Sequence, residues 1–101
     1  MTTTAQVLRD AKALIADPDH WIKGKNTVLN DGQICRCSAG AIRSAAIHQS
    51  DGPVSSQPAY FAMWAATGGP RLTAWNDHPE TTHADVMAAF DRAIESEEAK
   101  S

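Results

Sequence analysis

The stretch from Cys35 to Ile42 constrains the fold of this chain more than any other part of it. Two cysteines, one residue apart, lead there into a run of small side chains. We expect a helix from Ser38 to about His48, with Ser38 as its N-cap, because a serine side chain readily accepts a hydrogen bond from the first turn. Gly40 costs about 1 kcal/mol in a helix interior relative to alanine. It therefore predicts that another segment of backbone passes close to this helix, which would lie at the centre of the fold.

A second compact signature, Trp75-Asn76-Asp77, lies downstream. Asparagine and aspartate side chains commonly bond nearby backbone N–H groups in turns and at helix starts. A tryptophan beside them is typical of a core anchor whose indole N–H needs one partner. We expect this triplet to dock against the cysteine stretch as part of the scaffold. The predicted structural motif comprises Cys37, Gly40, Trp75, Asn76 and Asp77.

Capping and proline signals predict further helices around this centre. The expected helices run from Thr3 or Thr4 to about Asp17, from near Pro58 to Gly68, over one turn at 72–75, and onward from Thr81 or Thr82. Pro18 ends the first of them, since the residue before a proline is pushed out of helical geometry. Thr82 and Asp85 approximate a capping box for the last helix. Its charged end, from Glu95 to Lys100, is expected to fray.

A β-hairpin is the one expected departure from helical structure. Two short β-prone runs, Thr27-Val28-Leu29 and Gln33-Ile34-Cys35, flank Asn30-Asp31-Gly32, and an Asp-Gly pair between such runs favours a tight turn. The fold class predicted is mainly α: a compact single-domain bundle of about four helices with at most a short β-hairpin near residues 27–35. A chain of 101 residues is typical of one domain. We expect that domain to span 1–101, with an ordered core at about 4–95.

Composition and charge make a nucleic-acid or a membrane partner less favourable. The chain is 43% hydrophobic and 21% charged, with a formal net charge of −3 and no cluster of Lys or Arg. A protein that follows a phosphate backbone needs a basic face, so a nucleic-acid partner is disfavoured. No apolar run approaches the roughly 20 residues that cross a bilayer, and the N-terminus lacks a signal-peptide pattern. We expect a cytoplasmic protein without a membrane partner, and self-association stays open.

Two alternatives would give the cysteines a chemical role. In the first, Cys35 and Cys37 bind zinc together with His78 and His83, although structural zinc sites usually pair Cys-x₂₋₄-Cys with a second pair. The competing interpretation is that one cysteine is a small buried hydrophobic side chain at a helix start, and we expect no cofactor.

In the second alternative, Cys37 is a nucleophile. The dipole of the following helix would lower its pKa, His83 or His78 would act as base, and Asp77 or Asp85 would orient that base. No Gly-rich phosphate loop, Gly-x-Ser-x-Gly elbow or His-Glu-x-x-His pattern accompanies this set. We therefore expect no catalytic residue.

The aromatic row Tyr60, Phe61 and Trp64 is expected to lie in the core. If Tyr60 and the neighbouring Met63 are exposed instead, they become candidates for a partner-binding face.

The motifs together resemble those of a known family. They are Trp21, Cys37-Ser38-Ala39-Gly40-Ala41-Ile42, Trp75-Asn76-Asp77, and Thr82-x-x-Asp85-Val86 followed by Ala93. This pattern is similar to a family of unknown function whose members are small proteins of actinobacteria and their phages. The family usually has glutamate where this chain has Asp85, a change that keeps the capping role. The resemblance covers roughly residues 5–95, and it implies the fold and an actinobacterial or phage origin but no activity.

The favoured function is that of a small non-enzymatic protein-binding module, encoded by a phage and acting on a host protein. It depends on small size, an acidic net charge and the lack of an active-site motif. The rival is a zinc-binding or cysteine-dependent enzyme that uses Cys35 or Cys37 with His78 or His83.

Overall fold

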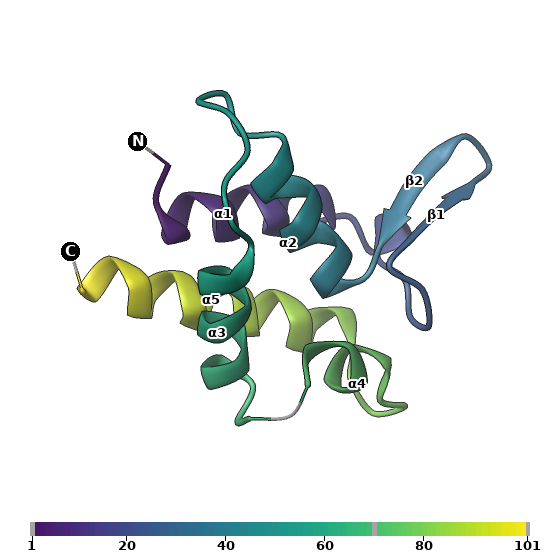
Figure 1. The fold of residues 1–101 in the computed structure, drawn as a ribbon. Coiled ribbons are helices and arrows are strands. Elements are labelled where there is room, and N and C mark those ends of the chain that lie inside the picture. Colours follow the sequence, from purple (N-terminus) through teal and green to yellow (C-terminus); the bar gives the residue numbers. More distant parts are fainter. Residues whose placement is uncertain (1, 70, 101) are drawn as a thin grey trace.

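A computed structural model describes residues 2–69 and 71–100 of the chain (Figure 1). These residues form a mainly helical fold with one two-stranded antiparallel sheet, as predicted. The elements are α1 (Thr4–Leu14), a 3-10 helix η1 (Pro18–His20), β1 (Thr27–Asn30), β2 (Gln33–Arg36), α2 (Ser38–Ile47), α3 (Gln57–Ala66), α4 (Leu72–Asp77) and α5 (His83–Ala99). No helix within them has both the length and the apolar character needed to span a bilayer.

Helix α1 begins where predicted and ends earlier. The Thr3 side chain caps it by accepting a hydrogen bond from the backbone N–H of Gln6 at 3.1 Å. The prediction that it runs to about Asp17 is wrong, because the helix closes at Leu14 and the Asp17 side chain instead caps η1. That carboxylate accepts a hydrogen bond from the backbone N–H of Asp19 at 2.9 Å. Pro18 thus begins a new short helix.

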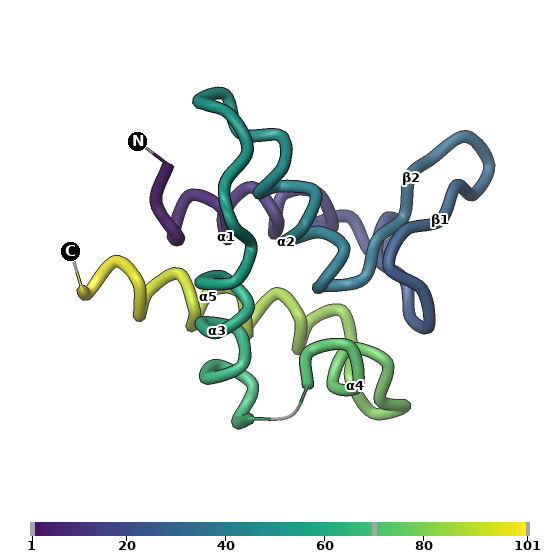
Figure 2. The backbone as a smooth tube through the Cα atoms, in the orientation of Figure 1, coloured from purple at the N-terminus to yellow at the C-terminus, as the bar shows by residue number. Residues whose placement is uncertain are grey.

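The hairpin forms at the predicted place. Val28 pairs with Cys35 and Leu29 with Ile34, and the turn between the strands holds Asp31 at φ 51° and Gly32 at φ 80°. Both angles lie in the left-handed region that two-residue hairpin turns require. The sheet projects from the helical body beyond the start of α2 (Figure 2).

The cap of α2 differs from the one predicted. Cys37, in extended geometry, is the N-cap, and Ser38 is already the first helical residue. The prediction of Ser38 as the cap is therefore wrong by one position. A thiol takes the place of the usual hydroxyl by accepting a hydrogen bond from the backbone N–H of Gly40.

The last helix is correctly predicted at its start and not at its end. Thr82 caps it, and Thr82 and Asp85 form the expected capping box. Residues Glu95 to Ala99 stay helical, so the expected fraying of this end is wrong. An ion pair between Arg9 of α1 and Glu98 holds that end against the first helix, and Lys12 approaches Asp91 to 2.6 Å along the same face. Each exposed pair contributes roughly 0–1 kcal/mol.

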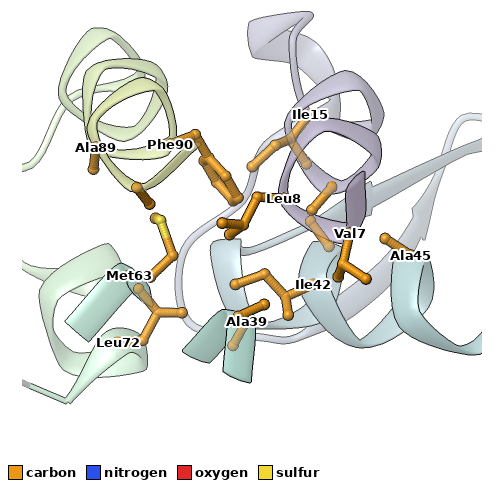
Figure 3. Close-up of a cluster of buried hydrophobic side chains, with 14 of the residues drawn as sticks. Val7, Leu8, Ile15, Ala39, Ile42, Ala45, Met63, Leu72, Ala89 and Phe90 are labelled. Carbon is orange, nitrogen blue, oxygen red and sulfur yellow. The ribbon is translucent and has the colours of Figure 1, made fainter. Parts of the chain in front are cut away.

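One hydrophobic cluster joins the five α-helices (Figure 3). Its fully buried large side chains include Leu8, Ile15, Ile42, Met63 and Phe90. Between them α2 contributes mostly alanines, which let its backbone come close to its neighbours. Helix α2 packs mainly against α1, which in turn packs against α5, so the prediction that α2 lies at the centre of the fold is not confirmed.

Candidate functional site

Asn76 is the hub where the two sequence motifs meet. Its side-chain oxygen accepts hydrogen bonds from the indole Nε1 of Trp21 at 2.7 Å, from the backbone N–H of Ser38 at 3.0 Å and from the Ser38 hydroxyl at 2.6 Å. Its amide nitrogen donates to the carbonyl oxygen of Ile22 at 3.1 Å and to a carboxylate oxygen of Asp77 at 3.0 Å. Asn76 is fully buried, and both ends of its amide are satisfied. One side chain of α4 thus joins the start of α2 to the loop after η1.

Asp77 extends this network to the same loop. One of its carboxylate oxygens accepts a hydrogen bond from the backbone N–H of Gly24 at 2.8 Å as well as the one from Asn76. Nearby, the ammonium group of Lys23 donates to the carbonyl oxygen of His78 at 2.7 Å and lies 5.6 Å from the centre of the Trp21 ring. Asp77 therefore holds the segment that leads into the hairpin.

Cys37 connects the other side of α2 to that segment. Its backbone N–H donates to the carbonyl oxygen of Asn26 at 3.1 Å, and its thiol donates to the Asn26 side-chain oxygen at 3.4 Å. The sulfur also accepts a hydrogen bond from the backbone N–H of Gly40 at 3.3 Å. We call this set of contacts the clasp: Trp21, Asn26, Cys37, Ser38, Gly40, Asn76 and Asp77.

Gly40 has the close backbone neighbour that its position predicted. A Cβ placed on it would lie 2.8 Å from the carbonyl carbon of Asn26 and closer still to the oxygen. No side chain fits there without moving the backbone. The prediction of close approach is confirmed, and the segment responsible is the loop before β1.

Burial raises the pKa of the Cys37 thiol, and the negative charge of Asp77 raises it further. Hydrogen bonds from the backbone of Gly40 and Ala39 act in the opposite direction without reversing the shift. The lowered pKa expected from the helix dipole is therefore wrong in sign. Because the thiolate is the nucleophilic form, this environment makes Cys37 less reactive than a free thiol.

The residues of the two chemical alternatives have separate partners. The thiol of Cys35 donates to the carbonyl oxygen of Asp19 at 3.3 Å, and Nδ1 of His78 lies 3.1 Å from the backbone N–H of Glu80. His83 places Nε2 2.7 Å from the carbonyl oxygen of Ile15, and its ring packs against Trp21.

Neither alternative set comes together. Among the residues that the structure describes, no group of three or more His, Cys, Asp or Glu side chains is placed to hold a metal ion. The predicted zinc ligands Cys35, Cys37, His78 and His83 therefore do not form one site. In the same residues, no hydrogen bond links His83 to Cys37 or to Asp77.

A hollow of about 300 Å³ opens beside the clasp. Cys37 and Asp77 line it together with Gly24, Lys25, Asn26 and Thr73. Its walls offer the Cys37 thiol, whose pKa is raised, the Lys25 side chain and the Asp77 carboxylate, one oxygen of which already accepts two hydrogen bonds.

The aromatic helix α3 is oriented differently from the prediction. Met63 is fully buried and the hydroxyl of half-buried Tyr60 donates to the carbonyl oxygen of Ala39 at 3.3 Å, so neither is an exposed partner-binding side chain. Phe61 and Trp64, expected in the core, are 62% and 52% exposed. Helix α3 thus has an exposed aromatic face, but Phe61 and Trp64 form it, not Tyr60 and Met63.

Three members of the clasp, Trp21, Ser38 and Asn26, lie outside the predicted structural motif. Ser38 was assigned to a cap, and Asn26 carried no signal of its own in a polar loop. The requirement of Gly40 for a neighbouring backbone was the only sign that some segment lay there.

Trp75, which that motif included, is partly buried against the core, but among the residues that the structure describes its indole N–H forms no hydrogen bond. The indole that bonds to Asn76 is that of Trp21.

The chain is a small, mainly helical domain in which a buried asparagine, a thiol cap and a close glycine contact bind α2 to α4 and to the loop before the hairpin. The chain belongs to a family of unknown function, DUF6197, whose profile matches residues 1–96. No curated protein and no solved structure matches the chain.

Proposed function

We propose that this chain is a small protein-binding module without catalytic activity. The observation that carries the proposal is the exposure of Phe61 and Trp64, three residues apart on α3. Residues at this spacing share a helix face. Large aromatic side chains supply much of the energy at protein interfaces and are uncommon as a pair in contact with water.

The core does not require these two rings. The inward side of α3 is made by Ala59 and Met63, which are 1% and 0% exposed. Phe61 and Trp64 lie on the outward side, where smaller polar residues would leave the buried contacts of the helix intact. Their size is better explained by a contact outside the chain.

The chemistry of the clasp supports a role other than catalysis. The pKa of Cys37 is raised, and the oxygen and nitrogen of the Asn76 side chain are occupied by structural hydrogen bonds. No structural observation favours the alternative of zinc or cysteine-dependent chemistry at Cys35, Cys37, His78 and His83.

We also propose that the chain is encoded by an actinobacterial phage and binds a host protein in the cytoplasm. The origin is what the resemblance of its motifs implies. Two free cysteines fit a reducing compartment, where disulfides seldom persist.

Affinity capture from an actinobacterial lysate tests the proposal when it is combined with matched variants. The tagged chain is compared with Phe61→Ser/Trp64→Ser and with a control, Ala13→Ser/Ala84→Ser, that alters exposed positions on α1 and α5. We expect one protein to be enriched at least tenfold by the chain and the control and lost by the aromatic variant, with circular dichroism unchanged in all three.

Two results would contradict the proposal. One is the absence of any protein whose capture depends on the aromatic pair. The other is a light-scattering mass that shows a dimer of the chain and a monomer of the aromatic variant, because a second copy would then occupy this face.

A further inference from the structure

A groove lies between the hairpin and the outer side of α2. It contains a hollow of about 320 Å³ lined by Thr27 and Arg36 from the strands and by Arg43 and Ile47 from the helix, among others. Figure 1 shows the hairpin projecting beyond the start of α2. The groove is thus bounded by two elements that both lead into the clasp.

Strand alternation shows which hairpin side chains border this groove. In the observed register Thr27 pairs with Arg36 and Leu29 with Ile34, so these four side chains share one face. The opposite face carries Cys35, whose thiol meets the backbone of η1 at Asp19. The face with Leu29 and Ile34 is therefore the one turned toward the hollow.

Three exposed aliphatic side chains extend this surface: Ile47 lines the hollow, and Leu29 and Ile34 lie farther along the same face of the hairpin, outside the lining of the hollow. Leu29 and Ile34 form a cross-strand pair that is 74% and 48% exposed, and Ile47 on α2 is 45% exposed. An exposed pair on a two-stranded sheet gains nothing from the core. We call the surface formed by Thr27, Leu29, Ile34, Arg36, Arg43 and Ile47 the hairpin groove.

The charge of the hairpin groove is opposite to that of the chain. Among the residues that the structure describes, the guanidinium groups of Arg36 and Arg43 form no hydrogen bond and no ion pair. Arg9 and Lys12, in contrast, are paired with carboxylates on α5. Two unpaired guanidinium groups beside apolar side chains, in a chain of net charge −3, suit carboxylates supplied from outside.

A neighbouring hollow lengthens the surface. It has a volume of about 360 Å³ and shares Arg36, Ser44 and His48 with the first. Asp10 at its far wall already accepts hydrogen bonds from the side chains of Gln6 and Gln49, both at 2.8 Å. Because the two hollows share Arg36, Ser44 and His48, they form one continuous surface.

We propose that the hairpin groove binds a short acidic segment of a partner protein, with its carboxylates on Arg36 and Arg43 and its apolar side chains against Leu29, Ile34 and Ile47. The inference rests on the proposed protein-binding function and adds a second contact surface to it. Aliphatic walls favour a peptide over nucleic acid, whose bases stack on aromatic side chains.

A peptide selection tests this inference directly. The whole chain is used to select from a library of random twelve-residue peptides, and the affinity of the enriched peptides is measured by fluorescence anisotropy. We expect enriched peptides to alternate Asp or Glu with apolar residues. Arg36→Gln and Arg43→Gln should each weaken their binding at least fivefold, whereas Arg71→Gln, an exposed arginine at the start of α4, should leave it unchanged.

Three results would overturn the inference. They are the absence of enriched peptides, enriched peptides that bind both arginine variants as well as the parent chain, and tighter binding of a twelve-residue oligothymidylate than of any peptide.

The two proposals can fail separately. If the selection fails but capture still depends on Phe61 and Trp64, only the hairpin-groove proposal is rejected. If acidic peptides bind but capture does not depend on Phe61 and Trp64, only the proposal for the aromatic face is rejected.

Discussion

Asn76 shows how much of this fold depends on single side chains. Its one oxygen receives three donors that would otherwise be buried without partners. An unpaired buried donor costs about 1–3 kcal/mol, which is a large part of the stability of a domain this small. This need explains the asparagine of the Trp-Asn-Asp signature.

Gly40 gives a prediction at the same scale. Replacing glycine by alanine in a helix normally stabilises it by about 0.5–1 kcal/mol. Here Gly40→Ala should instead lower the free energy of unfolding by about 1–3 kcal/mol, because the new methyl group meets the backbone of Asn26. Urea denaturation measures the change, and Ala13→Gly on the exposed side of α1 calibrates the ordinary helix effect. A stabilised Gly40→Ala protein would show that the loop does not pass where the structure places it.

Cys37 gives a second prediction, on reactivity and pH. With its pKa raised by burial, the native thiol should react with iodoacetamide at pH 7.5 at least tenfold more slowly than after unfolding in urea. A raised pKa in the folded state also means that stability is full below the ordinary thiol pKa and falls as pH rises beyond it. Cys35→Ser isolates the Cys37 signal.

Rapid labelling of native Cys37 would contradict this account. So would near-stoichiometric zinc in the purified protein that disappears in Cys37→Ser, since it would favour the metal alternative.

At the scale of elements, local signals predicted the hairpin and the start of α5. Both depend on contacts within a few residues: left-handed angles at Asp31 and Gly32, and the exchange of hydrogen bonds between Thr82 and Asp85. The residues that make these contacts are close in the sequence, so both elements could be predicted without the rest of the fold.

Helix α3 shows why the rest could not be predicted. Its sequence is apolar on all sides, so periodicity does not indicate which side is buried. The helices that pack against α3 determine that Met63 is buried and that Phe61 and Trp64 are exposed. The role of Ser38 likewise could not be predicted, because its hydroxyl donates to Asn76, which is far away in the sequence.

The capping box of α5 predicts a dependence on acid. Hydrogen bonds from the backbone and then the side chain of Thr82 lower the pKa of Asp85 below its ordinary value. The stabilisation is therefore present above the ordinary carboxyl pKa, about 4, and is lost as pH falls below it. Thermal melts of the chain and of Asp85→Asn between pH 3 and 7 should converge at the acid end. Parallel curves over the whole range would contradict a role for this carboxylate.

At the scale of the molecule, buried and exposed residues have different roles. The clasp secures α2 to α4 and to the loop before the hairpin, and it uses residues of both sequence motifs: Cys37, Ser38 and Gly40 of the first, and Asn76 and Asp77 of the second. The surfaces proposed for binding, on α3 and in the hairpin groove, consist of residues outside those motifs. The motifs therefore identify how the chain folds, while its exposed side chains carry the proposed function.

A double-mutant cycle on Ser38 and Asn76 tests the central claim most directly. The free energy of unfolding is measured by urea denaturation for the chain, for Ser38→Ala, for Asn76→Ala and for the double variant. If the clasp is structural, the two substitutions should be coupled by at least about 1 kcal/mol, since each removes a partner of the other. A coupling near zero would contradict the claim that the two motifs stabilise the fold by contacting one another.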